Sequence, residues 1–216
     1  MVAGFETLEV CADLQGLNFE NTTHNILFHS RLRPIHAIMK EMSFFTMLWR
    51  RLYRGVESLL APLRRVDDEP AAKFLSAEAF SLFQRMSLVD RAHSLRVYFW
   101  LQQHGHDEAD LLTAGLLHDC GKAAAHLNVA QRTLKVLLKW FFPPLWRRLS
   151  TPVAPEHWRY PLYILARHPQ LGAEWARQAG CSDLTCWLIA HHEEDVPSDH
   201  PHYPLLRALK DADAAS

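Results

Sequence analysis

The sequence predicts an all-α protein made of one domain with an extension, or one and a half domains. From residue 74 onward apolar residues recur at helical spacing, and short segments rich in Gly, Pro or polar residues separate the helices. No segment alternates apolar and polar residues as a half-buried strand would, and no internal repeat is present. The chain has 216 residues, 49% of them hydrophobic, which is enough for a sizeable core.

The first 70 residues divide into two predicted segments. Residues 1–41 lack sustained periodicity, so we expect a flexible leader, and the native protein could begin at Met42. Within residues 42–70, an amphipathic helix is predicted over 43–64, followed by a linker over 67–70. The apolar stripe of this helix consists of Leu48, Leu52, Val56, Leu59 and Leu60. Docking onto the core is the expected role of the stripe, and contact with a membrane surface is the alternative.

The predicted domain, residues 71–216, contains a series of helices. They are expected over 88–104, from a cap at Asp107 to 118, and over 131–149, 160–168, 171–179, 183–192 and 204–214. Gly105 and Gly180 are predicted to end two of them, and Ser182 to cap another. Pro169 predicts that one helix stops at His168, because a residue before proline is disfavoured in the helical region.

The apolar run 140–146 contains the prolines Pro143 and Pro144, which should interrupt the third helix. We interpret the run as a core segment kinked by these prolines. The alternative, should it be exposed, is a partner or oligomer surface. Core packing is likewise expected for the tryptophans, which include Trp100, Trp140, Trp175 and Trp187.

Composition excludes several classes of protein. The net charge of −1 argues against a general affinity for nucleic acid. No apolar run reaches 18 residues, so no membrane span is expected. The N-terminal residues lack a basic segment followed by an apolar one, so no signal peptide is expected there. The four cysteines form no C-x-x-C pair, which favours reduced thiols and a cytoplasmic location.

Residues of the kinds that bind metals gather at helix ends and on apolar faces. His118 and Asp119 close an apolar helix, His168 ends a second, and the pair His191-His192 ends a third. His93 lies on the apolar stripe of a fourth helix. Any one of these histidines alone would be interpreted as a buried or capping residue. As a set they predict a metal site, since buried polar groups at so many helix ends need a common partner.

The last helix offers an acidic ligand. Leu206, Leu209 and Asp213 stand at positions i, i+3 and i+7 and therefore share one face of the helix. Asp211 points elsewhere, so helical geometry favours Asp213 as the ligand.

These residues, taken in order, resemble the H…HD…H…H…D pattern of the HD-domain superfamily of metal-dependent phosphohydrolases. The local matches are H-S-L-R-V from His93, L-L-H-D-C-G-K around His118, H-P-Q-L-G-A-E from His168, and H-H-E from His191. The resemblance covers roughly residues 76–214. More narrowly, Phe83-Gln84-Arg85-Met86 and the terminal Ala212-Asp213-Ala214 resemble segments of small, stand-alone HDIG-type bacterial proteins. The implied fold is a helical bundle with a metal site between its core helices.

The resemblance implies two metal ions. His93, His118, Asp119 and Asp213 would hold one, Asp119 would bridge, and His168, His191 and His192 would serve the other. An imidazole-rich shell favours Fe, Mn, Ni, Co or Zn. Asp119 would act in catalysis, and Lys122 could hold a phosphate oxygen or simply cap a helix end. Arg96 could support a phosphate or, more simply, pair with an acid.

The expected activity is hydrolysis of a nucleotide or another small phosphate ester, with homo-oligomerisation left open. The chain departs in two ways from the HD-GYP branch of the superfamily, whose enzymes cleave cyclic-di-GMP. No G-Y-P follows Glu193, and Val89 stands four residues before His93, where that branch can carry a glutamate. These departures argue against cyclic-di-GMP as substrate and against a third metal. Two alternatives stay open. One is an HD-fold di-iron oxygenase, and the other is a non-catalytic module that binds a nucleotide or a partner.

Overall fold

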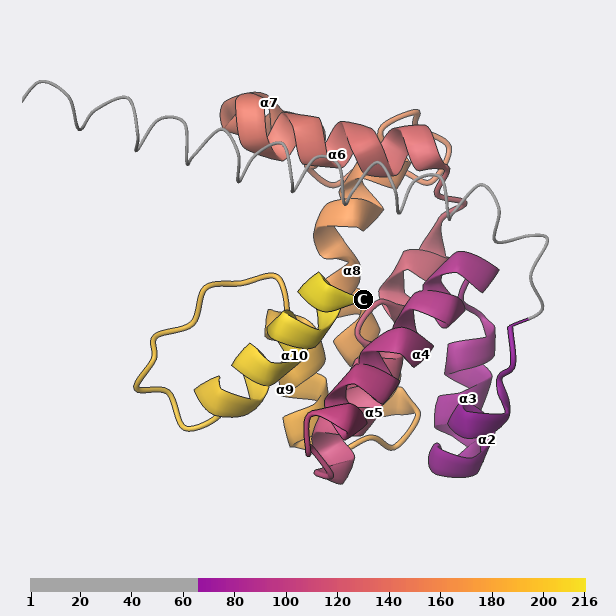
Figure 1. Ribbon diagram of the computed structural model, residues 1–216. Helices are drawn as coiled ribbons and strands as arrows, with labels where there is room; N and C mark the ends of the chain where they lie inside the picture. The colour runs from indigo at the N-terminus through magenta and orange to yellow at the C-terminus, as the bar shows by residue number, and fades with distance from the viewer. Residues whose placement is uncertain (1–65) are drawn as a thin grey trace, which may run out of the picture. The chain divides into compact units, whose positions relative to one another are not determined.

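The computed structural model describes residues 66–216, and all regular elements in that part of the chain are helices. This confirms the predicted all-α class. The predicted leader over 1–41 and the predicted helix over 43–64 lie outside the described residues. In chain order the elements are α2 (Glu69–Phe74), α3 (Ala77–Gln84), α4 (Leu88–Gln103), α5 (Ala109–Leu117), the 3-10 helix η2 (Cys120–Ala124), α6 (Val129–Phe141), α7 (Pro143–Leu149), α8 (Tyr160–Gln178), α9 (Asp183–His191) and α10 (Tyr203–Ala215) (Figure 1).

Polar side chains define where several helices begin. The Ser87 hydroxyl accepts from the Asp90 amide at the start of α4. The predicted cap at Ser182 is confirmed, since its hydroxyl accepts from the Thr185 amide at the start of α9. Asn128 and Gln131 form a reciprocal capping box that starts α6 two residues before the predicted position. Each of these bonds satisfies an amide that the first helical turn leaves without a partner.

Three predicted boundaries were wrong. Glu69 and Pro70 belong to α2 rather than to a linker, because proline suits the first turn of a helix. α5 begins at Ala109 without a side-chain cap, so Asp107 does not cap it. α8 continues through Pro169 instead of stopping at His168, because the surrounding core holds both halves of the helix in line.

The main hydrophobic core joins α2, α3, α4, α5, α9, α10 and the second half of α8. Its largest fully buried side chains include Phe83, Leu101, Leu117 and Leu188. α5 packs closely on α4 because Gly115 has no side chain. A Cβ at Gly115 would lie 3.0 Å from a methyl group of Leu101. This close packing fixes the end of α5, where the predicted ligands begin.

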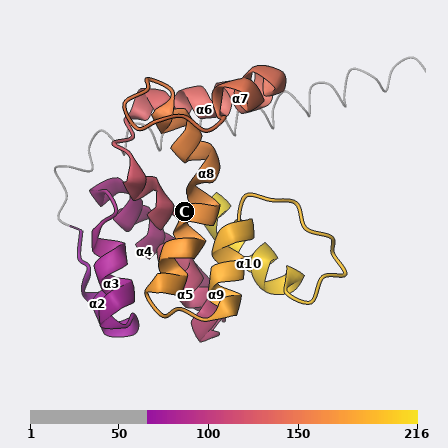
Figure 2. The same ribbon diagram turned by 180° about the vertical axis from the view of Figure 1, so that it is seen from behind.

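α6 and α7, residues 129–149, form an arm across one end of the bundle. The arm lies apart from the other helices in both views, and the first half of α8 connects it to them (Figures 1 and 2). It has a small core of its own, in which Leu138 and Trp146 pack against Leu162 and Leu165 of α8. The predicted interruption at Pro143-Pro144 is confirmed, since α6 ends at Phe141 and α7 starts at Pro143.

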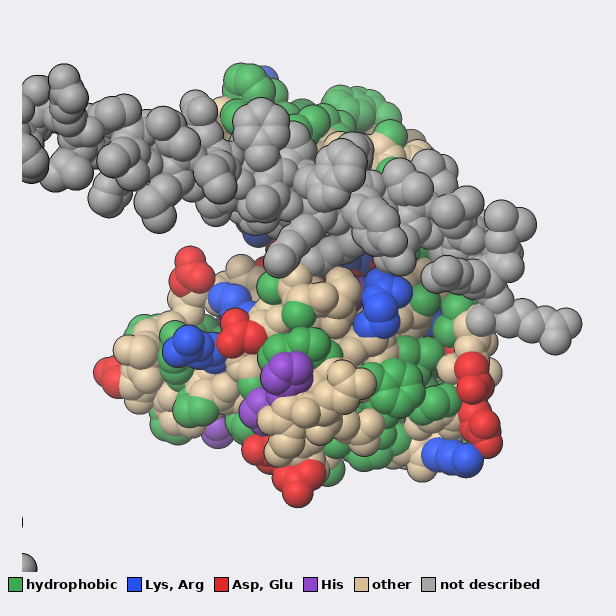
Figure 3. All heavy atoms as spheres, viewed as in Figure 1, with side chains coloured by type: hydrophobic (Ala, Val, Ile, Leu, Met, Phe, Trp, Pro, Cys, Tyr) green, Lys and Arg blue, Asp and Glu red, His purple; other side chains and the backbone are tan. Residues whose placement is uncertain are grey.

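The interpretation of residues 140–146 as a core segment was wrong for most of the run. Trp146 is buried, but Trp140, Phe141, Phe142 and Leu145 are exposed. Figure 3 shows apolar side chains gathered along the top of the molecule, over α6 and α7. The run fails to enter a core because the arm is too thin to bury both of its faces. Of the tryptophans expected in the core, Trp100, Trp175 and Trp187 are partly buried against the main core.

Candidate metal centre

Six of the predicted ligands form two adjacent groups in the structure. One group consists of His93, His118 and Asp213, and the other of Asp119, His168 and His192. Within each group, one ligand atom from every residue lies within 4.8 Å of the others. The six residues come from α4, the end of α5, α8, the end of α9, and α10. The fold therefore brings together side chains that are up to 120 positions apart in the sequence.

The first group is organised around the Asp213 carboxylate. His93 Nε2 is 2.8 Å from Asp213 Oδ1, and His118 Nε2 is 3.9 Å from the same oxygen. Burial opposes ionisation of Asp213, but the hydrogen bond from His93 and the nearby imidazole of His118 hold its pKa well below its usual range. Asp211, the other candidate, is exposed and lies 3.7 Å from Arg207. The structure thus places the ionised Asp213, and not Asp211, beside the histidines.

The second group is organised around Asp119, whose two oxygens face different ways. Oδ1 lies 3.3 Å from His168 Nε2 and 3.8 Å from His192 Nε2. Oδ2 lies 3.5 Å from His118 Nε2, a member of the first group. One carboxylate therefore lies between the two groups, which is the position required of a residue that bridges two cations.

Backbone carbonyl groups determine how the buried imidazoles are oriented. His118 Nδ1 lies 3.0 Å from the Gly115 carbonyl, and His192 Nδ1 lies 2.8 Å from the Ile189 carbonyl. Both carbonyls are in the last turn of a helix, where intrahelical partners are missing. A carbonyl can only accept, so each Nδ1 must carry the proton. Each Nε2 therefore presents a lone pair to the centre of the site, as metal-binding histidines do.

His168 achieves the same orientation in the middle of a helix. Its Nδ1 donates to the Leu165 carbonyl at 3.0 Å. That carbonyl would normally accept the amide of residue 169, but Pro169 has no N–H to donate. The proline that was predicted to end the helix instead leaves a carbonyl for His168 and so directs its Nε2 toward Asp119.

Two nitrogen atoms at the centre lack any hydrogen-bond partner among the described residues. They are Nε2 of His118 and Nε2 of His168, both fully enclosed. A buried polar atom without a partner is costly, and such atoms are rare in folded proteins. A cation would satisfy both lone pairs, and the surrounding set of imidazoles and carboxylates suits a divalent transition metal. The residues present therefore fit the implied metal site.

Protonation states also suit metal binding. Burial lowers the pKa of His192 to about 3, helped by the nearby His118 and His168, because the three rings disfavour positive charge on one another. Burial also lowers the pKa of His168, although Asp119 opposes this effect. Burial opposes ionisation of Asp119, but Lys122 and His118 hold the pKa of this carboxyl well below its usual range. Neutral imidazoles and ionised carboxylates are the forms that coordinate metals.

The seventh predicted ligand, His191, lies outside both groups. Its ring stacks on Trp187 with centroids 4.4 Å apart, and its Nδ1 is 2.8 Å from the Trp187 carbonyl. Its Nε2 is 3.7 Å from Glu194, on the partly exposed side of α9. Consecutive residues at the end of α9 point in different directions, so only His192 of the pair faces the centre.

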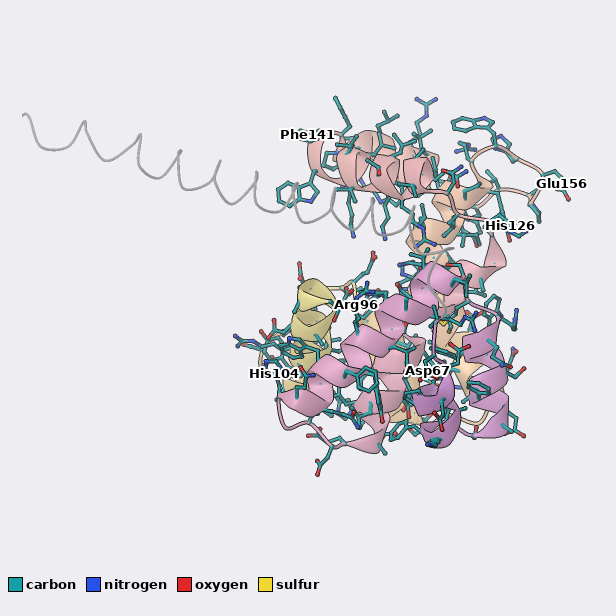
Figure 4. The ribbon with its side chains drawn as sticks, turned by 45° about the vertical axis from the view of Figure 1, so that its right-hand side comes forward. Asp67, Arg96, His104, His126, Phe141 and Glu156 are labelled. Carbon is teal, nitrogen blue, oxygen red and sulfur yellow. The ribbon has the colours of Figure 1, made fainter. Side chains whose placement is uncertain are left out.

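Lys122 lies in η2, directly beside the bridging carboxylate. Its Nζ is 2.5 Å from Asp119 Oδ2. Burial disfavours the ammonium form, but the carboxylates of Asp119 and Asp90 outweigh this and raise the Lys122 pKa. Arg96, the weaker phosphate candidate, is exposed on the side of the bundle that faces the arm (Figure 4). A permanent positive charge is therefore held by Lys122 at the centre itself.

Sequence reasoning missed the ion pairs that connect the arm to this centre. Glu193 Oε1 is 3.8 Å from His168 Nε2, and the Glu193 carboxylate also accepts from Lys135 at 2.5 Å and Lys139 at 3.2 Å. Burial raises the pKa of Glu193, but Lys135 and His168 outweigh it and hold that pKa well below its usual range. The H-H-E sequence contained Glu193, yet nothing in it revealed which lysines the arm would supply.

A second missed ion pair joins the arm to α4. Arg132 makes two hydrogen bonds to the buried Asp90, at 2.6 and 2.9 Å, and the Ser87 hydroxyl donates to the same carboxylate. Such bidentate pairs are among the stronger polar contacts in proteins. The arm is therefore held at two places, one on α4 and one beside His168.

Comparison of the chain with protein-family models, with curated proteins and with solved structures finds no match. None of the helices in residues 66–216 is both long and apolar enough to cross a membrane.

Proposed function

We propose that the protein is a metal-dependent phosphohydrolase or phosphodiesterase that acts on a nucleotide or another small phosphate ester. The observation that carries the proposal is the pair of adjacent His and Asp groups, in which Asp119 of one group lies 3.5 Å from His118 of the other. Two enclosed imidazole nitrogens at this centre lack hydrogen-bond partners among the described residues. The order of motifs along the chain, which resembles that of the HD-domain superfamily, supports the same activity.

His93, His118 and Asp213 would hold one divalent ion, His168 and His192 a second, and Asp119 would contact both. Two such ions supply a hydroxide nucleophile at neutral pH and neutralise the charge of a phosphate.

The chain's own residues provide orientation and charge. The carbonyls of Gly115, Leu165 and Ile189 fix the imidazoles by accepting from Nδ1, so that each Nε2 faces inward. Lys122 places an ammonium next to the centre, where it would stabilise the negative charge that develops on a phosphoryl oxygen. The bundle buries His118, His168 and His192, which keeps these imidazoles away from bulk water and strengthens their electrostatic effects.

The proposal is tested by loading the purified chain with Mn, Fe, Co, Ni or Zn. Bound metal is measured by elemental analysis, and hydrolysis is measured with nucleotides, cyclic dinucleotides and simple aryl phosphates. His192→Ala should lose metal and activity, whereas His191→Ala is the matched control that should keep both, because only His192 points to the centre. Lys122→Ala should keep its metal and lose turnover by roughly 10²-fold or more.

Hydrolysis of none of these substrates by fully metal-loaded protein would refute the proposal. Oxygen uptake together with an iron-dependent EPR signal would instead indicate the di-iron oxygenase. Metal binding by His191→Ala and His192→Ala to the same extent would show that the centre is assembled differently from the arrangement described above.

A further inference from the structure

The arm presents its polar face to the bundle and its apolar face outward. Arg132, Lys135 and Lys139 recur at i, i+3 and i+7 along α6 and make ion pairs with Asp90 and Glu193 of the bundle. In a helix that is stabilised by packing on its own protein, the apolar stripe faces the core. α6 has the opposite orientation, since only Leu138 of its apolar residues is buried.

The outward face is broad and apolar. Leu134 and Leu137 on α6 are 40% and 39% exposed, and Phe142 and Leu145 at the α6–α7 junction are 59% and 43% exposed. These four residues form the outer face of the arm. Figure 4 shows Phe141 at one end of the arm, which lies above the bundle, and Figure 3 shows apolar side chains along the top of the arm. Exposed apolar patches of this kind mark surfaces that bind a protein, a membrane or a ligand.

Positive charge lies at one end of the outer face. Residues 120–155 contain six Lys or Arg and no Asp or Glu, and four of these cations pair with Asp90, Asp119 and Glu193. Arg147 and Arg148 follow Leu145 directly on α7 and are exposed. Neither arginine makes an ion pair with any of residues 66–216. The outer face therefore ends in two cations that are available to a negatively charged partner.

We propose that the outer face of the arm binds the surface of an anionic lipid bilayer. A helix with apolar residues on one face and Lys or Arg on the other lies in the plane of a membrane interface, with its apolar side chains among the acyl chains. Basic residues beside such a face are attracted to anionic headgroups. The arm fits this mode because α6 and α7 are too short and too charged to cross a bilayer.

Charge argues against the two other occupants of this face. A second copy of the arm would bring its own Arg147 and Arg148 to the same face. The segment 43–65 of this chain has an apolar stripe, but it contains five arginines and a single acidic residue. Both would repel the arm electrostatically, whereas an anionic bilayer supplies an apolar interior and a negative surface together.

The test is co-sedimentation of the full chain with vesicles of phosphatidylcholine alone and of an equal mixture with phosphatidylserine. We expect binding to the mixed vesicles that weakens at high salt. The double variant Leu137→Asp, Phe142→Asp and the double variant Arg147→Glu, Arg148→Glu should each reduce binding about tenfold or more. Phe99→Asp is the matched control, because Phe99 is an equally exposed apolar residue on α4, and it should bind as the wild type does.

Unchanged thermal unfolding and metal content would show that each variant is folded. Failure of the wild-type chain to bind mixed vesicles overturns the proposal. Binding of both arm variants to the mixed vesicles as tightly as the wild type also overturns it, because the contact would then lie in another part of the chain. A dimer that dissociates in Leu137→Asp, Phe142→Asp without any vesicle binding overturns it as well and identifies a second copy as the occupant.

Discussion

Replacing Gly121 with alanine should disrupt the metal centre through the backbone. An ideal Cβ at Gly121 would lie 2.1 Å from the His168 carbonyl oxygen and 2.8 Å from the Gly172 amide nitrogen. Both obstacles are backbone atoms of α8, so no side-chain rotation can relieve the clash, and η2 must separate from α8 by roughly 1 Å. The distance from His168 Nε2 to Asp119 Oδ1 is only 3.3 Å, and the same separation would lengthen it.

Inserting an atom into a well-packed interior costs about 1–3 kcal/mol, and backbone obstacles place Gly121→Ala at the upper end. For a chain of this length, about 3 kcal/mol corresponds to a fall of about 6–12 °C in the unfolding temperature. Differential scanning fluorimetry measures this fall, and elemental analysis measures the accompanying loss of bound metal.

Gly115→Ala is the matched control for this substitution. Its Cβ would meet the flexible end of Leu101 at 3.0 Å, and the alanine would also favour the helical conformation of α5. We expect this variant to unfold within a few degrees of the wild type and to retain metal. A Gly121→Ala chain that is as stable and as metal-rich as Gly115→Ala would refute the proposed contact between η2 and α8.

Three further predictions follow from the site and the arm. Adding Mn²⁺ or Zn²⁺ to the metal-free chain at 100 times its dissociation constant should stabilise it by about 2.7 kcal/mol, seen as a higher unfolding temperature, and His168→Ala should abolish the effect. Burial lowers the pKa of His168, and lowers that of His192 to about 3, so the unfolded chain takes up protons first as the pH falls. The metal-free chain should therefore lose stability as the pH falls below about 6.5, by up to about 1.4 kcal/mol per pH unit for each histidine. Urea denaturation at about pH 7 and pH 5 measures this loss, and equal free energies of unfolding at the two pH values would contradict it. Arg132→Leu leaves Asp90 ionised and buried without its partner and should cost about 3 kcal/mol in urea denaturation, and adding Asp90→Asn should restore part of that loss.

Helical periodicity was sufficient to predict the class of fold and most of the ligand-type residues that the structure brings together. His93 and Asp213 could be chosen because each lies at helical spacing from apolar neighbours that face the core. His191 and His192 could not be separated in this way. The preceding residues Trp187, Leu188 and Ile189 are all apolar, so the sequence contains no polar face from which to orient α9.

Two features depend on tertiary packing and could not be predicted locally. Pro169 usually ends a helix, but the main core and the core of the arm hold α8 on either side of it. The apolar run that includes Phe142 and Leu145 has the composition of a core segment. Its exposure results from the position of the arm outside the bundle, which no local pattern encodes.

The separate core of the arm has a consequence for how the folded chain opens. Four side chains, namely Leu138, Trp146, Leu162 and Leu165, form a cluster that can come apart while the main core stays intact. Such clusters open as cooperative units with lower free energies than global unfolding. The backbone amides of α6 should accordingly exchange their hydrogens with solvent sooner than those of α5. Because the Leu165 carbonyl accepts from His168, each opening also loosens one imidazole and gives small molecules a transient route to the buried nitrogen atoms.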